Sequence, residues 1–146
     1  MSTRVYLAGP EVFLPNAAEI LECKRELTRA AELVPVSPGD LSIPKLDDRH
    51  ALGLAISRVD EELMESADAI IANLTPFRGL PADTGTCFEL GYMCARGKQA
   101  FAYTNVAADH YARTLDYYGG KIAMGADGHK RSPDGLSMAA RQGRAQ

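Results

Sequence analysis

Apolar residues are grouped along this chain in short runs that alternate with longer stretches of mixed polarity. The short runs predict four buried strands, at residues 5–8, 33–36, 69–74 and 100–104. The intervening stretches place apolar residues three and four positions apart and predict helices, at residues 16–31, 50–66, 86–96 and 108–118. This alternation of strands and helices predicts an α/β fold, with an open, mostly parallel sheet and helices on both of its faces.

Loops follow three of the predicted strands and are the first places to look for a ligand site. They cover residues 9–16, 75–89 and 105–110. In a parallel sheet, ligands bind outside the carboxyl ends of the strands, where the strand order changes direction. We therefore expect the functional side chains on these loops or at the starts of the helices that follow them.

The composition is that of one folded domain followed by a different C-terminal segment. The chain has 146 residues, of which 46% are apolar and 24% charged, so one sizeable core is possible. Residues 119–146 hold six of the 13 glycines and carry a net charge of +3, whereas the preceding residues carry −6. We therefore divide the chain into a domain at residues 1–118 and a Gly-rich basic tail at residues 119–146, which is solvated or takes part in a subunit contact. An acidic body argues against a nucleic acid polymer as the partner.

Several classes of cofactor and location are disfavoured by what the sequence lacks. The three cysteines form no C-x-x-C pair, and the three histidines have no ligand-like spacing, so we expect neither a disulfide framework nor a metal. No G-x-G-x-x-G follows the first strand, and we expect no cofactor. No run approaches the ~18 apolar residues of a membrane helix, and the first residues lack the apolar segment of a signal peptide. A cytoplasmic protein without a membrane partner is the expectation.

The segment from Asp83 to Glu89 offers the clearest candidate chemistry. Thr84 or Thr86 can cap a helix here, which would place Glu89 in the first turn, where the helix dipole favours an ionised carboxylate. Such an acid often serves only to stabilise the helix. Glu89 also lies between apolar neighbours, however, and a carboxylate held ionised against apolar walls is a good nucleophile. Two carboxylates near one pocket suit glycosidic chemistry, and both interpretations stay open at this point.

Four other residues each allow a structural and a functional interpretation. Gly9 after the first strand is a turn glycine or a point of close ligand approach, and Asp60 belongs to an acidic helix face that is solvated or points in part toward a strand end. Tyr6 lies inside the first strand, and its hydroxyl needs a partner if it is buried. Arg78 is a surface loop charge or an anion contact.

Taken together, three stretches resemble the nucleoside 2-deoxyribosyltransferase family over roughly residues 4–104. They are VYLAGP at residues 5–10 with Phe13 following, ADAIIANLTPFRG at residues 67–79, and DTGTCFELGY at residues 83–92. The resemblance implies a flavodoxin-like parallel sheet of about five strands. It also implies cleavage of the N-glycosidic bond of 2′-deoxynucleosides, transfer of the sugar to another nucleobase, and a homo-oligomer, a dimer or larger.

The resemblance also implies roles for individual residues. Glu89 matches the nucleophile that forms a covalent deoxyribosyl ester, and Tyr6 matches a tyrosine that contacts this carboxylate. Asp83 matches a carboxylate that positions the sugar. Asp60 falls where some members carry an Asp that protonates or holds the leaving base. The resemblance therefore implies that Glu89, Asp60 and Tyr6 are the catalytic residues.

Further residues are expected to bind the substrate. Gly9 and Phe13 match the loop and ring that wall the family's pocket, and Gly85 lies in the same motif as Asp83. Arg78, in the PFRG segment, or the cations of the basic tail are the candidate contacts for a 5′-phosphate.

The sequence departs from the family near its C-terminus. The family's Asn-Leu-Met segment, whose Asn reaches the site of a neighbouring subunit, has no match in residues 137–146. Three hypotheses follow. The first is a deoxyribosyltransferase. The second is an N-glycosidase, a hydrolase acting on deoxynucleosides or their 5′-monophosphates with water in place of the second base. The third is a non-catalytic nucleoside-binding module.

Overall fold

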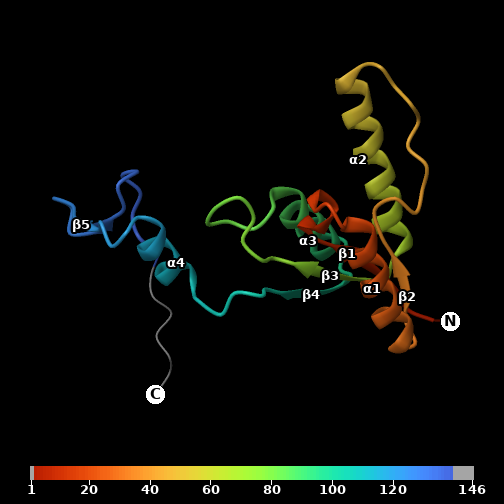
Figure 1. Ribbon diagram of the computed structural model, residues 1–146, viewed down its shortest axis with the longest axis horizontal. Coiled ribbons are helices and arrows are strands. Elements are labelled where there is room, and N and C mark those ends of the chain that lie inside the picture. The colour runs from red at the N-terminus through yellow and green to blue at the C-terminus, as the bar shows by residue number, and fades with distance from the viewer. Residues whose placement is uncertain (1, 140–146) are drawn as a thin grey trace. The chain divides into compact units, whose positions relative to one another are not determined.

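A computed structural model describes residues 2–139, which fall into two compact units (Figure 1). The first unit combines the residues up to 75 with residues 82–104, and the second combines residues 76–81 with those from 105 onward. This division groups residues 105–118 with the segment that follows them. The domain boundary at residue 118 stays a prediction. Residues 140–146 of the proposed tail lie outside the described residues.

The first unit is built on a parallel sheet, as the sequence predicts. Its strands stand in the order β2-β1-β3-β4, and every neighbouring pair is parallel. The bounds are β1 Arg4–Ala8, β2 Val34–Val36, β3 Ala69–Asn73 and β4 Gln99–Tyr103. The α/β fold class is therefore confirmed. Among the described residues the parallel sheet has four strands, one fewer than the family resemblance implies.

Helices connect these strands, close to the predicted positions. They are α1 Ala17–Ala30, α2 Arg49–Ser66 and α3 Thr84–Ala95, with a short 3-10 helix η1 at Pro10–Phe13 that the sequence pattern did not reveal. Asp48 caps α2 by accepting hydrogen bonds from the amides of His50 and Ala51. At the start of α1, the Asn16 side chain makes no cap hydrogen bond.

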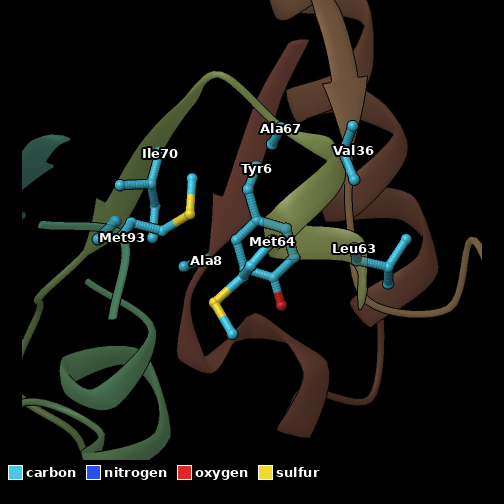
Figure 2. Close-up of a cluster of buried hydrophobic side chains, with 9 residues drawn as sticks. Tyr6, Ala8, Val36, Leu63, Met64, Ala67, Ile70 and Met93 are labelled. Carbon is cyan, nitrogen blue, oxygen red and sulfur yellow. The ribbon is translucent and has the colours of Figure 1, made fainter. Parts of the chain in front are cut away.

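The side chains of the sheet form one core on each of its faces. Tyr6, Ala8, Ile70 and Ala72 face the same way and pack with Leu63 and Met64 of α2 and Met93 of α3 (Figure 2). The alternate residues Val5, Leu7 and Ala69 point to the opposite face, as the two-residue period of a strand requires. On that face Leu7 lines a cavity together with Ala17, Ala18 and Leu21 of α1. Helices therefore cover both faces, with α1 on one and α2 and α3 on the other.

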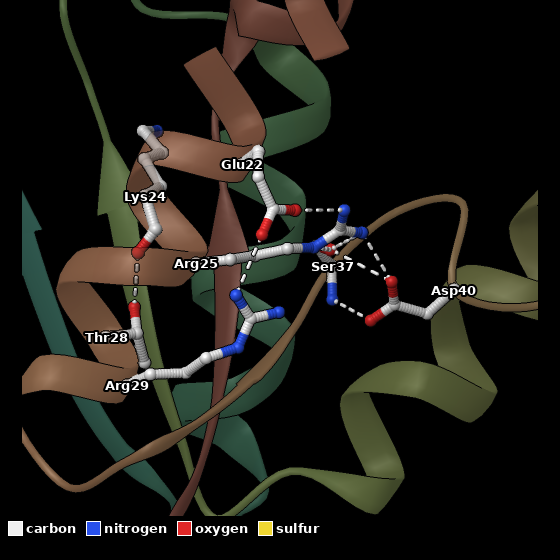
Figure 3. Close-up of polar contacts among 7 residues, drawn as sticks. All are labelled: Glu22, Lys24, Arg25, Thr28, Arg29, Ser37 and Asp40. Atoms are coloured by element: carbon white, nitrogen blue, oxygen red, sulfur yellow. Dashed lines mark hydrogen bonds and ion pairs between the residues drawn. The ribbon is translucent and has the colours of Figure 1, made fainter. Parts of the chain in front are cut away.

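The loop that follows β2 is fixed to α1 by polar contacts (Figure 3). The Arg25 guanidinium donates to the buried Ser37 hydroxyl at 2.6 Å and to Asp40 Oδ1 at 2.5 Å. Asp40 in turn accepts a hydrogen bond from the Ser37 amide at 2.8 Å. These contacts connect the segment after β2 to α1, and β2 itself pairs with β1.

The second unit contains α4 His110–Tyr117 and the antiparallel strands β5 Ala123–Met124 and β6 Lys130–Arg131. Asp109 caps α4 by accepting from the Ala112 amide. The Arg113 side chain donates to the Leu80 carbonyl at 2.6 Å and so joins α4 to the segment 76–81. Two glycines of the proposed tail, Gly125 and Gly128, lie in the turn that connects β5 and β6.

Candidate active site

A buried tyrosine and a partly buried glutamate are hydrogen-bonded at the centre of the first unit. Tyr6 of β1 has no exposed surface, and its hydroxyl donates to Glu89 Oε1 of α3 at 2.8 Å. Burial, followed by the charge and hydrogen bond of Glu89, raises the pKa of Tyr6 far above its ordinary value. Tyr6 therefore stays protonated and acts as a permanent hydrogen-bond donor to the carboxylate.

Glu89 has an unusual acidity for a carboxyl group. Burial raises its pKa to about 7, with smaller contributions from the charges of Asp60 and Asp83, while the hydrogen bond from Tyr6 lowers it. At neutral pH the free protein therefore holds comparable amounts of the protonated and ionised forms. The expectation that Glu89 lies in the first turn of the helix, where the dipole keeps it ionised, is wrong. Glu89 is the sixth residue of α3 and lies beyond the first turn, where the dipole acts most strongly.

The third residue of the group is Asp60 on α2. Burial raises the pKa of Asp60, and its charge raises the pKa of both Tyr6 and Glu89. Asp60 and Glu89 line the same cavity of about 230 Å³ between α2 and α3. The structure thus brings together the three residues that the sequence predicts to be catalytic, from three separate elements.

Asp83 acts in the structure as the N-cap of α3. Its Oδ2 accepts from the Thr86 amide at 2.9 Å and from the Thr86 hydroxyl at 3.0 Å. The prediction that Thr84 or Thr86 caps this helix is therefore wrong, because the acid one position before the helix takes that place. Gly85 lines the cavity, and a Cβ atom there would lie 3.1 Å from Asp83 Oδ2. The cap and the glycine set the path of the chain toward Glu89. A role for Asp83 and Gly85 in binding the sugar stays a prediction.

The remaining predicted residues lie elsewhere. Gly9 lines a separate cavity on the α1 face, and Phe13 of η1 is 57% exposed and does not line the Glu89 cavity. Arg78 belongs to the second unit, where its guanidinium lies over the Phe77 ring at 4.9 Å. Their roles in substrate binding stay predictions.

Part of the cavity wall comes from residues that the sequence analysis did not single out. Gly53, Ile56, Ser57 and Met64 of α2 line the cavity with Asp60, and Phe88 of α3 adds an aromatic side chain. The four α2 residues stand seven, four and three positions before Asp60 and four after it, which is the spacing of one helix face. Helical periodicity counted from Asp60 would have identified them.

The described residues contain neither a metal-binding cluster nor a membrane-spanning helix. No group of three or more His, Cys, Asp or Glu within residues 2–139 is placed to hold a metal ion. None of the helices in that range is long and apolar enough to cross a membrane. Among the described residues, the polar side chains that line the cavity are Ser57, Asp60 and Glu89, and Glu89 accepts from Tyr6.

Comparison with known proteins shows the family of the chain. The family model described as nucleoside 2-deoxyribosyltransferase matches residues 5–140. The chain belongs to the nucleoside 2-deoxyribosyltransferase family. The match spans both units and includes Tyr6, Asp60 and Glu89.

Three relatives illustrate the likeness. A 2-desoxiribosyltransferase from Leishmania mexicana is 31% identical with a TM-score of 0.69, covering 94% of this chain and 79% of its own. A 2-deoxyribosyltransferase from Bacillus psychrosaccharolyticus is 20% identical with a TM-score of 0.60, covering 73% and 76%, and bears on the fold alone. An uncharacterized protein of Schizosaccharomyces pombe is 39% identical over 103 residues, 68% of this chain. The chain spans about half, 49%, of that curated relative.

Proposed function

We propose that this protein is a nucleoside 2-deoxyribosyltransferase that works through a covalent intermediate on Glu89. The observation that carries the proposal is the Tyr6–Glu89 hydrogen bond of 2.8 Å beside a cavity that Asp60 also lines. The family membership and the deoxyribosyltransferase from Leishmania mexicana support the same substrate class, 2′-deoxynucleosides and free nucleobases.

The reaction consists of two displacements at the anomeric carbon. The ionised carboxylate of Glu89 attacks C1′, the N-glycosidic bond breaks, and the bond electrons leave with the base. Asp60, whose pKa is raised by burial, supplies the proton that the departing base takes up. A second base then attacks C1′ of the ester, its proton returns to Asp60, and Glu89 is released. Two inversions retain the configuration of the sugar.

Tyr6 has a positioning and electrostatic role in this scheme. Its hydroxyl keeps one oxygen of Glu89 occupied, which leaves the other oxygen to face C1′. The hydrogen bond also lowers the pKa of Glu89 against the effect of burial, so that more of the nucleophile is ionised at neutral pH. Because Tyr6 itself does not ionise in this range, the assistance is present at every working pH.

Base exchange is the experiment that tests the proposal. Incubation of the protein with a deoxynucleoside and a different free base should give the exchanged deoxynucleoside. Appearance of free deoxyribose alone would replace transfer by hydrolysis. The departure of residues 137–146 from the family's Asn-Leu-Met segment is the observation that favours this second function. Binding of a deoxynucleoside without any bond cleavage would leave only the non-catalytic module.

The pH dependence of the reaction follows from the acidity of Glu89. Since kcat/KM reports the free enzyme, its acid limb should lie near pH 7, with activity lost as Glu89 is protonated below that value. Tyr6→Phe removes the bond that lowers this pKa and should move the limb to higher pH. Asp60→Asn removes the group proposed to supply the proton to the departing base and should lower kcat.

A matched control for Tyr6→Phe is available on the same helix as Glu89. The Tyr92 hydroxyl donates to Glu65 at 2.6 Å, and Tyr92 does not line the cavity. Tyr92→Phe should leave the acid limb where it is. The electrostatic role of Tyr6 is refuted if Tyr6→Phe and Tyr92→Phe give the same pH profile of kcat/KM.

We also propose that the protein forms a homo-oligomer. Several large apolar side chains of the first unit are exposed, among them Leu54 at 48%, Phe88 at 58% and Phe101 at 57%. Such side chains favour association when they lie in one patch. Light scattering coupled to gel filtration should give a mass of at least twice the monomer; a monomer at micromolar concentration would contradict the proposal.

A further inference from the structure

A second cluster of charged groups lies at the carboxyl ends of the strands, apart from the Glu89 cavity. Lys24 Nζ of α1 lies 2.5 Å from Glu11 Oε1 of η1, with side chains 20% and 13% exposed. The Asn73 amide at the end of β3 donates to the same Glu11 oxygen at 2.6 Å. None of these three residues lines the Glu89 cavity.

This cluster lies at the point of the sheet where a ligand is expected to bind. The chain leaves β1 through α1 toward β2 on one side, whereas β3 and β4 lie on the other side of β1. The strand order therefore changes direction between β1 and β3, which is where ligands bind in open α/β sheets. The Glu11–Asn73 bond spans this point, because η1 follows β1 directly and Asn73 ends β3.

Asn73 extends the connection into the loop after β3. Its Oδ1 accepts from the Thr75 amide at 3.0 Å and from the Thr75 hydroxyl at 2.6 Å. On the other side, Lys24 Nζ lies 5.7 Å from the centre of the Tyr103 ring at the end of β4. Glu11 thus stands at the centre of contacts that join the ends of three strands to α1.

The packing around Gly9 is consistent with a fixed position for Glu11. A Cβ atom at Gly9 would clash with the Glu11 carboxylate and lie 3.0 Å from Asn73 Cβ. Burial alone would raise the pKa of Glu11, but the hydrogen bonds from Lys24 and Asn73 lower it below its ordinary value. The carboxylate is therefore ionised and held in place at neutral pH.

We propose that Glu11 is a positioning residue that, through Asn73 and Lys24, holds the loops after β1 and β3 in the arrangement that receives the nucleoside. This inference rests on the proposed function and adds to it a residue outside the reacting group. The partners of Glu11 are Lys24 and Asn73 and not the reacting pair, so its effect is on substrate binding and not on bond cleavage. When the loops are ordered in only a fraction of the molecules, the apparent affinity falls to that fraction of its full value.

The test compares Glu11→Ala with Glu11→Gln by steady-state kinetics with a deoxynucleoside and an acceptor base. In Glu11→Ala we expect KM for the deoxynucleoside to rise about tenfold, with kcat within about threefold of the wild type, if one tenth of the molecules keep the loops ordered. Glu11→Gln retains an oxygen that accepts from Asn73 and should restore most of the affinity. Glu26→Ala, which removes an exposed carboxylate of α1, is the matched control and should leave KM unchanged.

Two further variants keep the inference testable if Glu11→Ala is poorly folded. Gly9→Ala should displace the Glu11 carboxylate and raise KM in the same way, and Asn73→Ala should do so without changing η1 itself. The effects of Glu11→Ala and Asn73→Ala should be less than additive in the double variant, because both single variants remove the Glu11–Asn73 hydrogen bond. Additive effects, or an unchanged KM in Glu11→Ala, would overturn the inference.

Hydrogen exchange separates this inference from the proposed function. Amides at residues 11–14 and 73–75 should exchange faster in Glu11→Ala than in the wild type or in Glu26→Ala. If the wild type cleaves no deoxynucleoside, the proposed function fails, and this exchange measurement alone decides whether Glu11 holds the loops. Equal exchange in all three proteins overturns the positioning role even in an active enzyme.

Discussion

Replacement of Glu89 by Gln should lower kcat for base exchange at least about 10³-fold, the scale expected when a covalent nucleophile is removed. The new amide keeps the size of the side chain and an oxygen that accepts from the Tyr6 hydroxyl, so the cavity should keep its shape. Deoxynucleoside binding should therefore persist, and the loss should appear in kcat. Turnover within tenfold of the wild type would exclude Glu89 as the nucleophile.

The same substitution should stabilise the protein at alkaline pH. Because the folded protein holds the Glu89 proton up to a pKa of about 7 and the unfolded chain releases it near 4.5, wild-type stability falls as pH rises between these values. The Glu89→Gln variant has no titrating group at this position and no such dependence. Above pH 8 its free energy of unfolding should exceed that of the wild type by about 3 kcal/mol, at 1.36 kcal/mol for each pKa unit of difference.

Urea unfolding at pH 4 and pH 8.5 measures this effect. The two proteins should differ little at pH 4, where Glu89 is largely protonated in both the folded and the unfolded states, and clearly at pH 8.5. Glu26→Gln, on the exposed surface of α1, should match the wild type at both values. If Glu89→Gln is no more stable than the wild type at pH 8.5, then burial does not raise the pKa of Glu89 as described.

The second large effect is expected at Lys98, which closes the C-terminal end of α2. Its ammonium group donates to the carbonyls of Met64 at 2.7 Å, Glu65 at 2.8 Å and Ala67 at 2.7 Å. The last carbonyls of a helix have no partner within the helix, and this end of α2 packs into the core through Met64. Lys98→Met keeps the apolar stem and leaves these carbonyls without the charge, so we expect a loss of about 2–3 kcal/mol of stability.

Chemical denaturation of Lys98→Met beside Lys45→Met provides the comparison. Lys45 is exposed in the loop between β2 and α2, and its replacement should change stability by less than about 0.5 kcal/mol. Because Met64 also lines the Glu89 cavity, Lys98→Met should impair activity as well. Equal stability of the two variants would show that the three carbonyl contacts contribute nothing to the fold.

The sequence predicted the strands and helices of the first unit well because apolar periodicity records burial. AIIANL and VYLA are buried on both faces of a parallel sheet, so their apolar runs are unbroken. The pairing of Tyr6 with Glu89 could be inferred from the family pattern but not from spacing, because 83 residues separate them in the chain. The preference of helix caps for Ser, Thr, Asp and Asn did not identify the cap of α3, because several neighbouring residues are suitable. Asp83 takes the position that was expected for Thr84 or Thr86.

Other features depend on tertiary contacts that no local pattern contains. Glu11 lies in a short turn with no periodicity, and its partners Lys24 and Asn73 come from a helix and a strand that are distant in sequence. The acidity of Glu89 depends on burial between α2 and α3, which opposes and exceeds the influence of its hydrogen bond. The hairpin of β5 and β6 has only two residues in each strand, too few for an alternating pattern to show.

The most direct test of the proposed chemistry is the mass of the protein after reaction with a deoxynucleoside in the absence of an acceptor base. The covalent mechanism predicts an increase of ~116 Da, the mass of one deoxyribosyl group, on the peptide that contains Glu89. Addition of a free base should discharge the adduct and yield the exchanged nucleoside, and Glu89→Gln should never acquire it. Turnover of the deoxynucleoside with no adduct on rapid acid quenching, or an adduct on another residue, would contradict the assignment of Glu89 as the nucleophile.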